Sequence, residues 1–231
     1  MEKLDNLSQR QAVTILRFLY PIWMVFGIFS IMYVPSTLIV HGDAATTASN
    51  ILANQFLFRM GIVGSLITQL IFILAVLFLY RLFEPINKSH SLLMVVLGLV
   101  SVPIAMLNAL NEVAVLLLLN GTGHLTVFEP SQLQSLMMFF LDLNEQGIII
   151  ASIFWGLWLF PLGYLIYKSG YFPKIIGILV IIGGFGYTLG SFVHLLLPNL
   201  EVLLSVFGIM TFGEVIFLGW LLIKGAKLPQ S

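Results

Sequence analysis

Six apolar runs, each long enough to cross a lipid bilayer, constrain the fold of this chain more than any other feature. They lie at about residues 14–40, 57–80, 91–119, 143–167, 175–197 and 202–223. A helix needs about 20 apolar residues to cross a hydrocarbon core roughly 30 Å thick. The runs lack the alternating polarity of outer-membrane strands, so they predict helices. The predicted fold is all-α: a polytopic membrane protein with six transmembrane helices in a single domain, residues 1–231.

The composition agrees with this fold class and excludes several functions. The chain is 59% hydrophobic and 9% charged, whereas soluble domains are about 25% charged. It has no cysteine, which excludes disulfides and thiolate metal sites. Lys plus Arg and Asp plus Glu number 10 each, with no basic cluster, so nucleic acid is not an expected partner. The lipid bilayer is the expected surrounding.

The positions of lysine and arginine predict the orientation in the membrane. Nine of the 10 basic residues flank the apolar runs on one side, and only Arg59 lies on the other. Basic loops are retained in the cytoplasm, so both termini are predicted to be cytoplasmic, in a plasma (inner) membrane. Arg59 would then lie on the outer side, where Glu145 or Asp142 is expected to form a structural ion pair with it.

The outer loops are long enough for two short amphipathic helices. Asp43 is a suitable N-cap for a helix over 44–54. Ser131 and Gln134 match a capping box at the start of a second helix, whose apolar stripe ends at Leu141. We expect both helices to lie on the outer face, and the second to lead into the fourth crossing.

Glu214 is the most unusual residue of the chain, because it lies about 12 residues into the sixth crossing, near the middle of the bilayer. An ionised carboxylate at that depth costs about 3 kcal/mol or more. No Lys or Arg falls at the same depth in any of the six crossings. We therefore expect a neutral carboxyl, or one that is hydrogen-bonded to amides or water.

The third crossing supplies candidate partners for Glu214. Asn108, Asn111 and Glu112 fall within about one helical turn of each other. Pro103 in the same helix removes one backbone hydrogen bond and predicts a kink. The predicted ligand-binding residues of the chain are Glu214, Glu112, Asn108, Asn111, His194 and Gln69.

Two interpretations of these residues remain open. Ionisable residues inside membranes commonly mark a pathway or binding site, which favours an outward-facing polar cavity for a small molecule or cation. Amides and protonated carboxyls also join helices to each other, at about 1 kcal/mol for each interhelical hydrogen bond. The residue types alone do not choose between a cavity and helix contacts.

Patterns typical of metal sites and of enzymes are absent from the sequence. His41, His124 and His194 fall near the outer side but lack the i, i+4 spacing of a metal-binding helix. There is no nucleophile elbow and no pair of aspartates suited to a prenyl diphosphate. We predict no metal and no cofactor, and no residue is identified as catalytic.

Several segments resemble the bacterial integral membrane proteins grouped as domain of unknown function 4386. These segments are GDAATTASNILA at 42–53, FRMGIV at 58–63, LYRLFEPIN at 79–87, FWGLW at 154–158, LGYLIYKSGYFPKIIG at 162–177 and GFGY at 184–187. The resemblance covers most of the chain and implies the same six-crossing architecture. Members of that family often have histidines where this chain has Asn144 and Trp158, so the resemblance does not imply a histidine-bound metal or haem here.

The leading functional hypothesis is a non-enzymatic membrane protein that binds or passes a small ligand or ion in an outward-facing polar cavity. A second hypothesis is a membrane-embedded enzyme acting on a lipid or isoprenoid, with Glu214 or Glu112 as acid or base. A third is a structural or stress-response subunit whose polar residues only join helices. The sequence does not identify a ligand, an oligomeric state or a partner protein.

Overall fold

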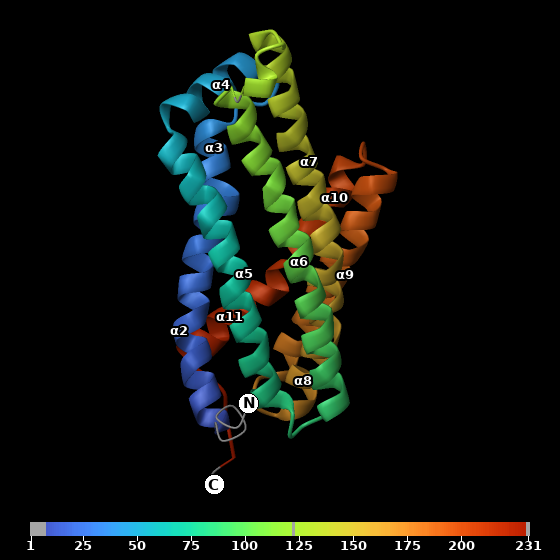
Figure 1. The fold of residues 1–231 in the computed structure, drawn as a ribbon. Helices are drawn as coiled ribbons and strands as arrows, with labels where there is room; N and C mark the ends of the chain where they lie inside the picture. Colours follow the sequence, from blue (N-terminus) through green and yellow to red (C-terminus); the bar gives the residue numbers. More distant parts are fainter. Residues whose placement is uncertain (1–7, 122, 230–231) are drawn as a thin grey trace. The chain divides into compact units, whose positions relative to one another are not determined.

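A computed structural model describes residues 8–121 and 123–229, without the side chain of His124. The elements are helical throughout these ranges (Figure 1). In chain order they are α2 (Gln9–Ile28), the π-helix η1 (Phe29–Tyr33), α3 (Val34–Leu38), α4 (Ala44–Ala53), α5 (Gln55–Phe83), α6 (Lys88–Leu119), the 3₁₀ helix η2 (Gly123–Leu125), α7 (Pro130–Leu157), α8 (Leu159–Ser169), α9 (Lys174–Leu196), α10 (Glu201–Met210) and α11 (Phe212–Ile223).

Six helical spans in the described residues are long and apolar enough to cross a membrane, which confirms the predicted fold class. They are Gln9–Leu38, Gln55–Phe83, Lys88–Leu119, Pro130–Ser169, Lys174–Leu196 and Glu201–Ile223. The predicted crossings fall within or beside these spans. The protein is therefore a polytopic, all-helical membrane protein.

The fourth span starts earlier than predicted. Its helix begins at Pro130 and includes the segment that was expected to form a separate surface helix. The Glu129 N–H donates to Gln132 Oε1 at 2.9 Å, as in a capping box two residues before the predicted pair of Ser131 and Gln134. Proline is well suited to the first helical position, since its missing N–H has no partner there. No glycine or proline follows before Gly147, so the helix continues unbroken into the crossing.

Three of the six spans are interrupted along their length, which the apolar pattern did not predict. The first contains a π-helical turn, in which the Val34 N–H bonds to the Phe29 carbonyl, followed by Pro35. The fourth is interrupted at Trp158 and the sixth at Thr211. Pro161 accounts for the break at Trp158, because proline has no N–H to donate to the Leu157 carbonyl. By contrast, α6 is one unbroken helix through Pro103, and the kink there stays a prediction.

By its internal contacts the chain divides into two units. The first contains the described residues up to Ile22, from Ile71 to Pro103 and from Ile149 onward, and the second contains Trp23–Leu70 and Ile104–Ile148. The expected single domain stays a prediction.

In the first unit, α9 packs against α8, α10 and α11 (Figure 1). The contact with α8 is close because glycines face each other across it. A Cβ atom on Gly177 would lie 2.6 Å from the Gly163 carbonyl oxygen, which leaves room for no larger residue. Small residues at a helix interface let the backbones approach and increase van der Waals packing in the membrane.

The ends of the helices in the first unit are joined by side chains of α2. The Arg17 guanidinium donates to the Leu222 carbonyl through Nε at 3.2 Å and Nη2 at 2.8 Å. Gln9 Nε2 donates to the Leu82 carbonyl at 2.7 Å and to the Tyr171 hydroxyl at 3.0 Å. These bonds satisfy carbonyls at helix ends that have no partner within the helix.

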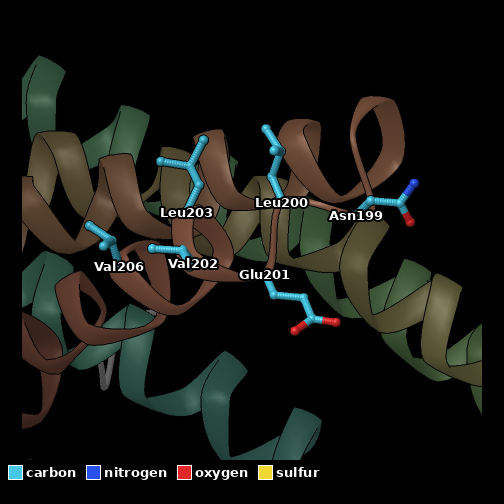
Figure 2. Close-up of a pocket in the computed structure, with 6 residues that line it drawn as sticks. All are labelled: Asn199, Leu200, Glu201, Val202, Leu203 and Val206. Atoms are coloured by element: carbon cyan, nitrogen blue, oxygen red, sulfur yellow. The ribbon is translucent and has the colours of Figure 1, made fainter.

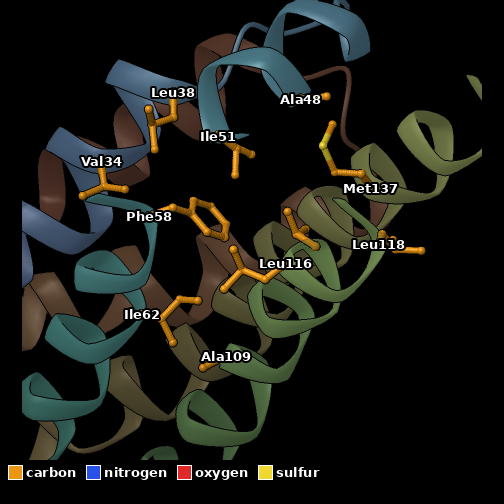
Figure 3. Packing of buried hydrophobic residues seen from close by; sticks show 11 residues of the cluster. Val34, Leu38, Ala48, Ile51, Phe58, Ile62, Ala109, Leu116, Leu118 and Met137 are labelled. Atoms are coloured by element: carbon orange, nitrogen blue, oxygen red, sulfur yellow. The ribbon is translucent and has the colours of Figure 1, made fainter. Parts of the chain in front are cut away.

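The second unit has its own apolar core, contributed by α3 to α7 (Figure 3). Ile51 of α4 and Met137 of α7 are fully buried in it. The predicted cap of α4 is confirmed: Asp43 Oδ1 accepts from the Thr46 N–H at 2.9 Å and Oδ2 from the Thr46 hydroxyl at 2.7 Å. The short helix α4 is thus fixed at one end by its cap and along one face by the core.

Candidate functional site

Glu214 lies in the first turn of α11, just after the interruption of the sixth span. The interruption contains two backbone bonds of i to i+3 spacing, from the Thr211 N–H to the Gly208 carbonyl at 3.3 Å and from the Glu214 N–H to the Thr211 carbonyl at 3.2 Å. The Thr211 hydroxyl also donates to the Gly208 carbonyl at 2.7 Å. Such i to i+3 bonds tighten a helix locally and often mark a functional position.

Two tyrosines of the first unit lie within electrostatic reach of this carboxyl. Glu214 acts electrostatically on the hydroxyls of Tyr20 in α2 and Tyr187 in α9, and the Tyr187 hydroxyl also contacts the Thr211 side chain. Tyr20 is 4% exposed, so its hydroxyl lies inside the unit. The Glu214 carboxyl is half-buried and forms no hydrogen bond or ion pair with any side chain in the described part of the chain.

The glycines of α9 bring the sixth span close to Tyr187. A Cβ atom on Gly186 would lie 2.7 Å from the Phe207 carbonyl oxygen and 2.8 Å from Met210 Cβ. On Gly190 it would lie 3.1 Å from Phe207 Cβ. The GxxxG spacing of these two glycines therefore serves close packing of α9 on α10.

In the second unit, the amides of the third crossing form an interhelical network. Asn108 Nδ2 donates to the Asn144 carbonyl at 2.8 Å, and Asn144 Nδ2 donates to the Asn108 carbonyl at 3.3 Å. Asn111 Nδ2 donates to Asn108 Oδ1 at 2.9 Å. Gly147 makes room for this network, since a Cβ there would overlap the Asn108 amide. The network joins α6 to α7, which supports a structural role for Asn108 and Asn111.

Two other predicted ligand-binding residues of the second unit, Glu112 and Gln69, do not take part in this hydrogen-bond network. Glu112 is half-buried in α6, and no side-chain hydrogen bond or ion pair joins it to another described residue. Gln69 Oε1 in α5 is buried and has no hydrogen-bond partner among the described residues. Both therefore retain unused polar atoms.

Of the remaining predicted residues, His194 and Arg59 lie near helix ends, whereas Asp142 and Glu145 lie in the middle of α7. His194 is half-buried in the last turn of α9. Arg59, Asp142 and Glu145 are exposed, and within the described ranges Arg59 makes no salt bridge. Its pairing with either acid stays a prediction.

The predicted ligand-binding residues are divided between the units. Glu214 and His194 belong to the first, and Glu112, Asn108, Asn111 and Gln69 belong to the second. That they line one cavity stays a prediction. Tyr20 and Tyr187 were missed, because a tyrosine in an apolar run is typical of ordinary packing. Asn144 was noted only as part of a polar cluster at the start of the fourth crossing.

A hollow of about 440 Å³ lies at the start of α10 (Figure 2). Its lining is one chain segment and mostly apolar: Asn199, Leu200, Glu201, Val202, Leu203 and Val206. None of the predicted ligand-binding residues lines it. Over the described residues, no group of three or more His, Asp or Glu side chains is placed to hold a metal ion.

Comparisons with known proteins give a family but no activity. Residues 18–225 match the family model described as a domain of unknown function, DUF4386. The chain is also 31% identical over 164 residues to an uncharacterised protein of Archaeoglobus fulgidus, covering 68% of this chain and 96% of that protein. No solved structure matches the chain. The match over nearly the whole sequence shows that the chain belongs to the DUF4386 family of membrane proteins.

Proposed function

We propose that this membrane protein binds a small cation at Glu214, in a polar cavity reached from the outer side, and that it thereby binds or passes an ion. The observation that carries the proposal is a carboxyl without a hydrogen-bond partner among the described residues, beside two tyrosine hydroxyls at the interruption of the sixth span.

The depth of Glu214 in its span favours a charged ligand. It lies ten residues from Lys224, which corresponds to about 15 Å along a helix, half of the hydrocarbon core. A carboxylate at that depth needs a compensating positive charge or a proton. Because the interiors of the six crossings contain no Lys or Arg, a bound cation would supply the compensating positive charge.

The chemistry around Glu214 suits a hard cation. Carboxylate, hydroxyl and backbone carbonyl oxygens are the usual ligands of such ions. Interrupted membrane helices commonly form ion sites, because backbone carbonyls at the interruption are free to coordinate. Here the interruption at Thr211 lies within one turn of Glu214, and Tyr187 contacts Thr211 from α9.

Glu112 is proposed to lie in the outer interface, near the outer end of α6. It lies 24 residues from Lys88 on one unbroken helix, about 36 Å at 1.5 Å per residue. That distance exceeds the hydrocarbon core, so Glu112 would lie in the outer interface if the basic residues mark the cytoplasmic side. This orientation, with both termini in the cytoplasm and the protein in the plasma membrane, is part of the proposal.

Thermal unfolding of purified protein in lipid nanodiscs tests the proposal. Unfolding temperature is measured in sodium, potassium or calcium chloride against choline chloride at equal ionic strength. We expect at least one metal cation to raise Tm of the unmodified chain and of Glu201→Gln, an exposed acid of the same span. Glu214→Gln should remove the rise. No rise with any ion, or an unchanged rise in Glu214→Gln, would contradict the proposal.

Passage is tested separately from binding. Proteoliposomes containing the protein and a sodium-, potassium- or calcium-sensitive dye are exposed to the ion that raised Tm. Uptake that is present in the unmodified chain and lost in Glu214→Gln supports passage. Binding without uptake would limit the function to binding.

A further inference from the structure

Two lysines at the turn between α8 and α9 are held above tyrosine rings. Lys168 Nζ lies 6.0 Å from the centroid of the Tyr164 ring, and Lys174 Nζ lies 5.4 Å from that of Tyr167. An ammonium over an aromatic face is attracted by the ring quadrupole. The two positive charges on either side of Gly170 are therefore positioned before any ligand arrives.

Neither ammonium is neutralised by an acid in the described part of the chain. The salt bridges of the first unit join Arg81 and Lys88 to Glu84. No acidic residue occurs between Glu145 and Glu201, so α8, the turn and α9 contribute none. Lys168 and Lys174 are both exposed and leave a local excess of positive charge.

A histidine lies against the same tyrosine. The rings of His90 and Tyr164 stack with centroids 4.2 Å apart and planes 24° apart. His90 Nδ1 is buried and has no hydrogen-bond partner among the described residues. The backbone N–H of His90 donates to Asn87 Oδ1 at 3.0 Å, which fixes the position of the histidine in the first turn of α6.

We propose that Lys168 and Lys174, with His90 packed against the Tyr164 ring, form a binding site for the phosphate group of an anionic phospholipid. Lysine binds phosphate as a point charge. Basic residues at a membrane surface attract anionic lipids strongly enough that each changes the affinity about fivefold. The turn joins two helical spans that are each long and apolar enough to cross a membrane, so the two ammonium groups are expected at the height of the lipid headgroups.

Lipid binding by the purified full-length protein tests the site. Dioleoyl phosphatidylglycerol is titrated into the protein in a neutral detergent, and affinity is read from the rise in Tm, with dioleoyl phosphatidylcholine and inorganic phosphate in parallel. The double variant Lys168→Gln, Lys174→Gln is compared with Lys224→Gln, Lys227→Gln, which removes equal charge from the end of the chain. The comparison separates a specific site from general surface charge.

We expect phosphatidylglycerol, but neither phosphatidylcholine nor inorganic phosphate, to stabilise the unmodified protein. The Lys168, Lys174 double variant should lose about tenfold or more in affinity, and the control pair should lose less than threefold. Tyr164→Phe should bind as the unmodified chain does, whereas Tyr164→Leu should bind more weakly, since only phenylalanine keeps the aromatic face.

Equal losses in the two double variants would overturn the proposal in favour of non-specific charge. Equal stabilisation by inorganic phosphate would overturn the lipid as the ligand. These outcomes do not depend on Glu214, so they are independent of the proposed cation site.

Discussion

Asn108 in the second unit and Glu214 in the first are both polar residues on apolar helices, yet their surroundings differ. The Asn108 amide donates to the Asn144 carbonyl and accepts from Asn111. The Glu214 carboxyl has no hydrogen-bond partner among the described residues, although Tyr187 lies near it. A satisfied polar group joins helices at little cost, whereas an unsatisfied one is expensive in lipid and is commonly kept for a function.

The largest loss of stability is expected from substitutions of the glycines that allow the helices to approach closely. Gly186→Ala should destabilise the first unit by about 1–3 kcal/mol, because the new Cβ would lie 2.7 Å from the Phe207 carbonyl oxygen. Gly147→Ala should cost a similar amount by displacing the Asn108 amide. Gly219→Ala is the control, since no atom lies within 4 Å of its Cβ position. Reversible unfolding in mixed micelles measures all three, and a loss in the control equal to that in the others would contradict the packing argument.

A smaller effect is expected from removing the amide network itself. Asn108→Leu should lower the free energy of unfolding by about 1–2 kcal/mol, since it removes the side-chain bonds to the Asn144 carbonyl and to Asn111. Asn111→Leu should cost less, because its side chain makes one of these bonds. If Asn108→Leu were as stable as the unmodified chain, the network would have no structural role and Asn108 would return to the candidate ligand contacts.

Glu214→Gln should change stability in the absence of metal cations by less than about 1 kcal/mol, because it removes a charge without removing a hydrogen bond to another described residue. The same variant should lose its response to the stabilising cation. Unfolding free energy with and without that cation measures both quantities. A large intrinsic loss with the cation response retained would make Glu214 a structural residue like Asn108.

The smallest expected effect is the pH-dependent contribution of the α4 cap to stability. The backbone N–H of Thr46, followed by its hydroxyl, lowers the pKa of the Asp43 carboxyl below the ordinary value. The ionised cap therefore adds stability above about pH 4, the ordinary aspartate pKa, and this contribution is lost as pH falls through the lowered pKa of the folded protein. Asp43→Asn should flatten this part of the stability profile between pH 5 and pH 2, measured by unfolding. If Asp43→Asn and the unmodified chain showed the same dependence of stability on pH, the cap would not be the cause of that dependence.

Much of the fold follows from the sequence because the membrane allows few solutions. Runs such as 57–80 and 91–119 had to be helices, since no other open structure satisfies backbone hydrogen bonds in lipid. The cap at Asp43 was equally local, because an N-cap depends on residues three positions apart. The start of the fourth helix was predicted two residues late because Glu129 and Ser131 are each followed three residues later by a glutamine, and spacing alone does not choose between the two pairs.

The candidate site was only partly predictable. Glu214 stands out in any apolar run, because a buried charge is costly wherever the helix lies. Its neighbours Tyr20 and Tyr187 come from helices distant in sequence, and tyrosine gives no signal that separates a site from ordinary packing. The same holds for Asn108, whose partner is a backbone carbonyl of Asn144 and so leaves no trace in side-chain chemistry.

The sequence by itself determined the six membrane-crossing segments, the α4 cap and the position of Glu214 within its span. These features depend on residues close together in the chain and on the cost of placing polar groups in lipid. Only the tertiary structure decided that Asn108 and Asn111 are used in a helix contact and that Lys168 and Lys174 lie over tyrosine rings. Those outcomes depend on which helices approach closely enough for side chains to meet.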